Sequence, residues 1–265
     1  CIRDSLCVMP EVKFYKYQGT GNDFVLIDDR EQLLKDLGKD LIGRWCDRRF
    51  GIGADGVILL RNHPECDFEM LYFNPDGSQS LCGNGSRCVV KFAHDLGIID
   101  KLCTFMAVDG QQQGFIDQST ISIKMQDVAK PEEVDGEYFV DTGSPHHVKM
   151  VQQLSKVDVH KEGKTIRNSK RYRPGGTNVN FIEPANGEVC IRTFERGVED
   201  ETLSCGTGVT AVALVMASRG YTSPVSVKAV GGDLQVSFNR QADHSFRDIY
   251  LSGPAEKVYE GTIHY

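Results

Sequence analysis

Hydrophobic residues recur along the chain in short runs separated by turn residues, a pattern typical of many short strands. In residues 120–125, for example, Ile121, Ile123 and Met125 alternate with polar positions, so one face of this strand would be buried. The strands that this pattern predicts cover residues 24–27, 57–60, 68–73, 120–125, 189–194, 225–230, 234–238 and 249–251. A helix is indicated over residues 31–45, where Leu33, Leu34, Leu37, Leu41 and Ile42 form one stripe.

Two further helices are predicted at residues 86–96 and 209–219, each directly after a Cys-Gly-x-Gly turn. Gly97 and Gly220 follow them at the position where a left-handed residue commonly ends a helix. The second helix, VTAVALVMASR, is apolar almost all round, so other elements must enclose it. We therefore expect this helix to lie inside a curved sheet rather than on its surface.

The two Cys-Gly-x-Gly turns belong to an internal repeat. Glycines lie 61 and 29 residues before Cys82 and 15 after it, and their counterparts lie 62 and 29 residues before Cys205 and 15 after it. These landmarks are Gly21, Gly53 and Gly97 in the first half and Gly143, Gly176 and Gly220 in the second. Agreement at this many positions indicates a duplicated fold with its junction in the acidic stretch 127–136.

The predicted fold class is α+β, with two pseudo-symmetric lobes. Each lobe would be a strongly curved mixed sheet wrapped round a central helix, and the active site would lie in the cleft between them. Residues 9–127 with 254–265 are expected to form the N-terminal lobe, and residues 128–253 the C-terminal lobe. Residues 1–8 are expected to be a leader or a tag-like extension.

Composition and charge limit the kinds of molecule that the protein is expected to bind. The chain of 265 residues is 40% hydrophobic and 25% charged with a net charge of −7, which argues against nucleic acid or an anionic membrane surface. The longest apolar run, 209–217, is far shorter than the roughly 20 residues that cross a bilayer. The nine cysteines contain no C-x-x-C pair, so we expect no zinc site, no disulfide framework and a reducing, cytoplasmic setting.

Cys82 and Cys205 each precede a helix, where free backbone N–H groups and the helix dipole favour a thiolate. A single such cysteine is more often a small buried hydrophobic residue, and glycine loops are often simple tight turns. Two equivalent cysteines, however, would approach one bound molecule from opposite sides. One could remove a proton from a carbon while the other returns one, which is racemisation or epimerisation.

Several segments together carry a family resemblance. They are GTGNDFVLID, FGIGADG, FNPDGSQSLCGNGSRC, TGSPHHV, GGTNVNF and FERGVEDETLSCGTG, and they span nearly the whole chain from Phe14 onward. In this order they resemble diaminopimelate epimerases. The resemblance implies conversion of LL- to meso-diaminopimelate in lysine and peptidoglycan precursor biosynthesis, without metal or pyridoxal phosphate or any other cofactor. It also implies a fold similar to that of proline racemase and the phenazine-biosynthesis isomerases.

The same resemblance implies roles for individual residues. Cys82 and Cys205 would transfer the protons, with His146 beside the first cysteine and Glu195 beside the second. The distal amino-acid head would be bound by Asn22, Asn74, Asn178, Glu195 and Arg196. The carboxylate at the reacting carbon would meet backbone N–H groups of Gly83, Asn84, Gly206 and Thr207. His147 is expected to be structural.

Two positions depart from the family pattern, and some alternatives stay open. Ser144 stands where many members have Asn, and Gly56 where some have Gln. A proline-type racemase of the same fold is one alternative. A phosphate- or dinucleotide-binding module is another, although GTGNDF lacks a third glycine and no G-K-[ST] follows any glycine loop. The expected partner is a small molecule, and the choice between monomer and homodimer is open.

Overall fold

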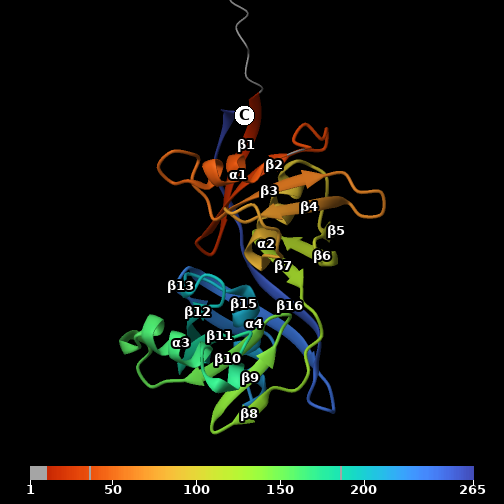
Figure 1. Ribbon diagram of the computed structural model, residues 1–265. Helices are drawn as coiled ribbons and strands as arrows, with labels where there is room; N and C mark the ends of the chain where they lie inside the picture. The colour runs from red at the N-terminus through yellow and green to blue at the C-terminus, as the bar shows by residue number, and fades with distance from the viewer. Residues whose placement is uncertain (1–10, 36, 186) are drawn as a thin grey trace, which may run out of the picture.

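Two lobes, stacked one above the other, make up the molecule (Figure 1). The computed structural model describes residues 11–35, 37–185 and 187–265, so the expectation for residues 1–8 lies outside the described part. We use the lobe bounds given above for the description. Within the described ranges, no helix is both long enough and apolar enough to cross a membrane.

The N-terminal lobe contains two α-helices and a curved sheet. Its elements are β1 (Glu11–Gly19), β2 (Asn22–Asp28), α1 (Lys39–Cys46), β3 (Gly56–Arg61), β4 (Phe68–Phe73), α2 (Gly83–Asp95), β5 (Leu102–Ala107), β6 (Gly110–Asp117), β7 (Thr120–Lys124) and β17 (Glu256–His264). Although β17 is the last strand of the chain, it pairs with β1, so the C-terminal strand lies beside the first strand at the top of Figure 1.

The C-terminal lobe has the same plan. Its elements are β8 (Glu132–Val134), β9 (Glu137–Asp141), β10 (Pro145–Met150), α3 (Val159–Arg167), β11 (Asn178–Ala185), β12 (Glu188–Glu195), β13 (Asp200–Thr202), α4 (Gly206–Ser218), β14 (Val225–Ala229), β15 (Gly232–Arg240) and β16 (Phe246–Pro254). Short 3-10 helices cover Leu154–Lys156 and Lys170–Tyr172.

Strand pairing shows the repeat directly. In the first half β2 is parallel to β3 and β4 to β5, while the pairs β1–β2, β3–β4, β5–β6 and β6–β7 are antiparallel. In the second half β10–β11 and β12–β14 are the parallel pairs, in the equivalent places. The two sheets join where β7 pairs antiparallel with β16. The mixed α+β fold with two pseudo-symmetric halves is therefore confirmed.

Each curved sheet encloses one helix. Helix α4 is buried from Val209 to Ala217 and packs against β9, β10, β11, β12, β14, β15 and β16. Helix α2 packs against β1, β2, β3, β4, β6, β7 and β17. The expectation that the apolar second helix lies inside a sheet is confirmed, because a helix with no polar face must be covered on all sides.

The helix expected over residues 31–45 is wrong in its first half. Among the described residues of this range, the helix begins at Lys39, and residues 33–35 form a turn. The buried carboxylate of Asp29 accepts a hydrogen bond from the backbone N–H of Leu34 at 3.0 Å and pairs with Arg61 at 2.7 Å. Because a side chain accepts a backbone N–H here, a tight turn replaces the helix that the leucine spacing indicated.

Candidate active site

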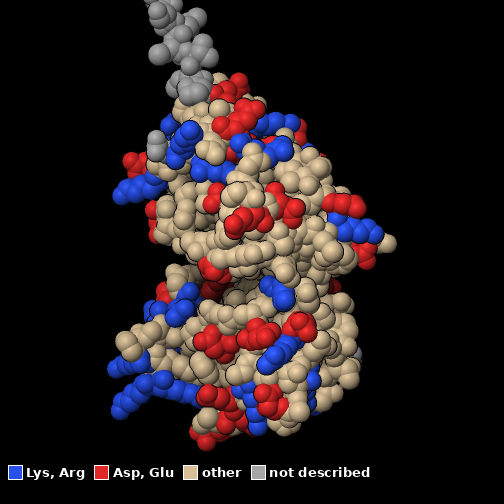
Figure 2. Space-filling model, turned by 90° about the vertical axis from the view of Figure 1, so that its right-hand side faces the viewer, with Lys and Arg blue, Asp and Glu red and all other residues tan. Residues whose placement is uncertain are grey.

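A cleft of about 600 Å³ lies between the two lobes, and Figure 2 shows a hollow at this waist. Both lobes contribute to its lining. From the N-terminal lobe come Gly21, Asn22, Arg48, Ala54, Asp55, Tyr72, Asn74, Pro75, Ser80, Leu81, Cys82, Gly83 and Asn84; from the C-terminal lobe come Glu195, Val198, Glu201, Thr202, Leu203, Ser204, Cys205, Gly206 and Thr207. Nine of the predicted site residues are in this set.

Cys82 and Cys205 occupy the same place in their lobes. Each is the N-cap residue of its helix and has an extended backbone, with φ −130° at Cys82 and −117° at Cys205. The two helix starts meet: a Cβ atom added to Gly206 would lie 3.9 Å from the Cα atom of Gly83. Both thiols are free. The repeat thus brings two thiols and two sets of unpaired helix N–H groups into one cleft.

Hydrogen bonds to the two sulfur atoms differ. The Cys82 sulfur accepts from the backbone N–H of Gly85 at 3.5 Å, and its thiol donates to Asn22 Oδ1 at 3.5 Å. The Cys205 sulfur lies 3.5 Å from the hydroxyl of Thr207. Cys82 is therefore held both by its own helix turn and by Asn22 of β2, and Cys205 by its own helix turn.

At both thiols, burial raises the pKa by more than the helix N-terminus lowers it. It raises the pKa of Cys82 to about 11, against the lowering effect of the Gly85 N–H, and the nearby Glu195 raises it further. It raises the pKa of Cys205 to about 12, again with a contribution from Glu195. The helix N-terminus therefore does not make either cysteine a thiolate, because desolvation penalises the charged sulfur more strongly.

Glu195 ends β12 and faces both cysteines. Its carboxylate accepts a hydrogen bond from the hydroxyl of Thr202 at 2.8 Å. Burial raises the pKa of Glu195. Its charge raises the pKa of Cys82 as well as that of Cys205, and it lines the same cleft as both thiols.

His146, on β10, is fully buried and its Nδ1 lies 3.2 Å from the amide nitrogen of Asn180. The family resemblance paired it with the first cysteine. A Cβ atom added to Gly208, however, would lie 3.4 Å from both His146 Cε1 and Cys205 Cβ. The structure therefore places His146 beside the second cysteine, since β10 packs against α4 in the same lobe. Burial and then the charge of Arg196 lower its pKa to about 3, so the imidazole is neutral.

Three asparagines of the first lobe reach the cleft. Asn22 donates to Asp55, and its Oδ1 accepts from Asn84 at 3.3 Å. Asn84 also donates to the carbonyl of Ser204 in the other lobe at 3.1 Å. Asn74 donates to the hydroxyls of Ser78 at 3.0 Å and Ser80 at 3.1 Å, which holds its own turn.

Asn178 and Arg196 do not line the cleft. The Asn178 amide donates to Ser144 Oγ at 2.8 Å, and its oxygen accepts from the backbone N–H of Arg196 at 2.9 Å. The guanidinium of Arg196 is exposed and reaches only the carbonyl of Gly175, at 3.5 Å. His147 is buried and its Nδ1 lies 2.8 Å from the hydroxyl of Tyr172.

Tyr72, Arg48 and Asp55 line the cleft without having been predicted. The Tyr72 ring occupies the space beside Gly56, where any Cβ atom would collide with it. Tyr72 precedes Cys82 by ten residues, as Glu195 precedes Cys205 by ten, so the repeat spacing could have found it. Arg48 pairs with Asp23 of β2 at 2.6 Å and with Asp55 at 2.7 Å. Asp23 is distant from Arg48 in sequence, so no local motif predicts that contact.

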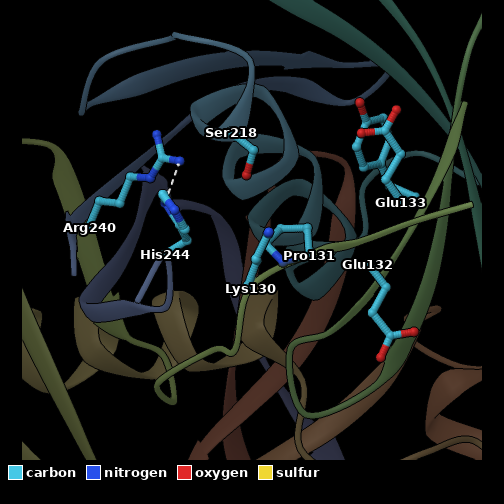
Figure 3. Close-up of a pocket in the computed structure, with 8 residues that line it drawn as sticks. Lys130, Pro131, Glu132, Glu133, Ser218, Arg240 and His244 are labelled. Atoms are coloured by element: carbon cyan, nitrogen blue, oxygen red, sulfur yellow. Dashed lines mark hydrogen bonds between the residues drawn. The ribbon is translucent and has the colours of Figure 1, made fainter. Parts of the chain in front are cut away.

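A second cavity, of about 590 Å³, lies at the C-terminal end of α4 (Figure 3). Its lining contains none of the predicted site residues; it consists of Lys130, Pro131, Glu132, Glu133, Tyr138, Ser218, Arg240 and His244. Arg240 donates to His244 at 3.0 Å and to the terminal helix carbonyl of Ala217 at 3.3 Å. The arginine thus caps the helix end. In the described residues no group of three histidine, cysteine or acidic side chains is arranged to hold a metal ion.

The family model for diaminopimelate epimerase matches residues 14–113 and 138–258, which include both cysteines. The chain belongs to the diaminopimelate epimerase family. It is 50% identical over 257 residues to the diaminopimelate epimerase of Flavobacterium psychrophilum, covering 95% of this chain and 100% of that one. The enzyme of Aquifex aeolicus is 41% identical over 276 residues, covering 95% and 98%. Like these relatives, the chain is an isomerase of the epimerase class.

Solved structures extend the likeness of fold. A PhzF-family phenazine biosynthesis protein from Bacillus anthracis has a TM-score of 0.75 at 14% identity, covering 97% of this chain and all of that one. A hydroxyproline epimerase from Agrobacterium vitis has a TM-score of 0.69 at 15% identity, covering 96% and 92%. The fold resemblance to proline racemase and phenazine-biosynthesis proteins is thereby confirmed.

Proposed function

We propose that this chain interconverts LL- and meso-diaminopimelate without a cofactor, using Cys82 and Cys205 as the base and the acid. The observation that carries the proposal is the meeting of two cysteine-capped helix starts in one cleft, next to a shared carboxylate. We further propose that the reaction serves lysine and peptidoglycan precursor biosynthesis in the cytoplasm. A reducing compartment suits an enzyme that needs two free thiols.

The proton balance requires the two cysteines to be in different states. The thiolate of one accepts the α-proton, and the thiol of the other donates a proton to the opposite face of the same carbon. After one turnover the two states are exchanged, so the reverse reaction uses the same pair. Two equivalent positions on a pseudo-two-fold axis supply this symmetry.

The backbone at the two helix starts would bind the carboxylate of the reacting centre. Gly83 and Asn84 on one side, and Gly206 and Thr207 on the other, begin helices whose first N–H groups have no partner within the helix. Negative charge moves from the α-carbon into this carboxylate as the proton leaves. Preorganised N–H donors stabilise that charge without a basic side chain or a metal.

The raised pKa values of the thiols set a condition on the mechanism. One cysteine must lose its proton when the substrate binds. The α-ammonium group of the substrate would favour a thiolate nearby. Glu195, which faces both cysteines, is the proposed proton acceptor. The neutral His146 and Asn180 would hold the start of α4, and so the position of Cys205.

The distal head would be bound by Asn22, Asn74, Asn178, Glu195 and Arg196. Arg196 is exposed. In this proposal the lobes close on the substrate until the Arg196 guanidinium reaches the distal carboxylate. A planar guanidinium matches a carboxylate with two parallel hydrogen bonds. A substrate with two charged heads would satisfy this arrangement, whereas proline lacks the second head.

The test is solvent hydrogen exchange. The protein is treated with chelator, freed of pyridoxal phosphate and incubated with LL-diaminopimelate in deuterated water. Meso product with deuterium at one α-carbon is expected, and proline should not exchange. A requirement for added metal or pyridoxal phosphate would refute the cofactor-free mechanism, and exchange of proline alone would refute the substrate.

A further inference from the structure

Arg87, on α2, is a buried cation without a carboxylate partner among the described residues. The side chain is fully buried. Its guanidinium donates only to neutral oxygens: Asn84 Oδ1 at 3.0 Å, Thr20 Oγ1 at 3.1 Å and the carbonyl of Pro254 at 3.3 Å. Its Nη1 has no hydrogen-bond partner in the described part of the chain. A charge buried in this way lowers the stability of the fold, so stability does not explain why an arginine stands here. Two observations indicate a role at the cysteines.

The first observation is the orientation of Asn84. Because arginine can only donate, the Asn84 oxygen must face it. The Asn84 nitrogen is then directed to Asn22 Oδ1 at 3.3 Å and to the carbonyl of Ser204 at 3.1 Å. Asn22 Oδ1 accepts from the Cys82 thiol, and Ser204 precedes Cys205. One amide therefore links the two cysteine turns across the lobes, and Arg87 fixes which way it points.

The second observation is a break in the repeat. Arg87 follows Cys82 by five residues, and the residue five positions after Cys205 is Thr210. The hydroxyl of Thr210 donates to the carbonyl of Gly206, one turn back on the same helix. The first cysteine turn is thus followed by a positive charge, that of Arg87, and the second by the neutral Thr210 at the equivalent position.

Other titratable groups also act on the two thiols. Glu195 raises the pKa of both cysteines. Near Cys82 lie Tyr72 and Cys88, which are neutral because burial raises the pKa of each. The charge of Arg87 lowers the pKa of Cys82, whereas the groups that most shift the pKa of Cys205 include no cation.

We propose that Arg87 is a positioning residue that orients Asn84 between the two cysteine turns and makes Cys82, rather than Cys205, the thiol that ionises first in the substrate-free enzyme. This inference rests on the proposed two-cysteine function. It assigns different protonation states to the two cysteines in the absence of substrate. The difference comes from the charge of Arg87 on α2.

The test measures thiol reactivity without substrate. Iodoacetamide reacts with thiolates, so site-resolved mass spectrometry of Cys82 and Cys205 at a series of pH values reports the ionisation of each. In the unaltered protein, the Cys82 rate should reach its half-maximum at a lower pH than the Cys205 rate. The pH dependence is compared rather than the rate alone, because the two sulfurs differ in exposure.

Three variants separate charge from structure. Arg87→Met, which keeps the apolar stem, should slow alkylation of Cys82 about tenfold at neutral pH and leave Cys205 within about twofold. Arg87→Lys keeps the charge but not the fork, so Cys82 reactivity should be largely retained while kcat for epimerisation falls about tenfold with little change in KM. Thr210→Val, at the matched position of the other lobe, should leave both thiols unchanged.

The outcomes decide between roles. Equal slowing of both cysteines in Arg87→Met would overturn the proposal, as would an unaltered protein in which Cys205 ionises first. If circular dichroism shows that Arg87→Met does not fold, the unaltered protein and Arg87→Lys still decide. Absence of diaminopimelate exchange with the expected thiol order would refute the proposed function and leave the effect of Arg87 on the thiols intact.

Discussion

The two lobes share one plan of strands, yet their central helices are built differently. Helix α4 is enclosed by apolar contacts almost throughout. Helix α2 is amphipathic: it buries Arg87 and ends in a polar cluster where Tyr17 donates to Asp95 at 2.7 Å. The cysteine N-cap and the glycines after it are retained in both. The two halves share the cysteine turn and the helix start that border the cleft. They differ in the side chains that pack along the rest of each helix.

The largest effect is expected where the lobes are most alike. Cys82→Ala and Cys205→Ala should each lower kcat/KM by about 10³-fold or more, because either change removes one of the two proposed proton-transfer groups. Cys66→Ala, a partly exposed free thiol outside the cleft, is the control and should retain activity. Steady-state assays in both directions measure this. Substantial turnover by either cleft variant would break the assumed equivalence of the lobes.

The next effect concerns a residue without an equivalent in the first lobe. Arg196→Ala should lower kcat/KM about 100-fold through loss of the distal carboxylate contact, and Arg196→Lys should recover only part. Arg247, likewise exposed in the C-terminal lobe, supplies the control: Arg247→Ala should match the parent enzyme. An Arg196→Ala enzyme with parental kinetics would mean that the distal head is bound elsewhere.

Matched positions on the two helices test the difference in packing. Leu214 on α4 and Lys91 on α2 each lie nine residues after their cysteine. Leu214→Ala should lower the free energy of unfolding by about 2–5 kcal/mol, because it leaves a cavity in a fully buried core. Lys91→Ala loses a partly exposed ion pair with Asp95 and should cost about 0.5 kcal/mol. Denaturant titration compares them, and equal costs would contradict the contrast.

Effects of opposite sign are expected at two carboxylates near the cleft. Asp23 is partly buried, but its pairs with Arg48 and Lys16 outweigh burial and lower its pKa to about 2. Its stabilising effect is complete above the ordinary carboxyl pKa and is lost as pH falls from there through about 2. Asp23→Asn should therefore lower stability at neutral pH by about 2 kcal/mol.

Glu195 behaves in the opposite way. Burial raises its pKa, so the folded state prefers the protonated form, and a stability cost develops as pH rises through the ordinary carboxyl range. Glu195→Gln should raise Tm at neutral pH and leave it unchanged in acid, while abolishing most activity. Thermal melts across pH measure both variants. A loss of stability at neutral pH in Glu195→Gln would show that its charge is better compensated than its surroundings indicate.

Sequence patterns located the features that repeat or that depend on local periodicity. The two cysteine turns, the enclosed helix α4 and the strand of residues 120–125 are in this group. β17 was not predicted, since it is exposed on both faces and shows no alternation. The turn at Asp29 depends on Arg61, which lies 32 residues away, and no local pattern contains that pair.

The sequence predicted some residues of the cleft and misplaced others. Residues in the repeated turns, such as Cys82 and Gly206, reached the cleft because backbone geometry places them there. Arg196 does not line the cleft, and its guanidinium contacts the carbonyl of Gly175 instead. His146 lies near Cys205 across Gly208, a contact that follows from the packing of β10 on α4 and that no motif contains.

The return of β17 to the first lobe has a consequence for biosynthesis. Glu11, on the first described strand, pairs with His264 on β17, which follows all the other strands in sequence. During translation β1 therefore keeps one open edge until β17 emerges. An unpaired strand edge is a template for association with other chains. The lobe that begins to form first is thus exposed to such association until its distant closing strand is available.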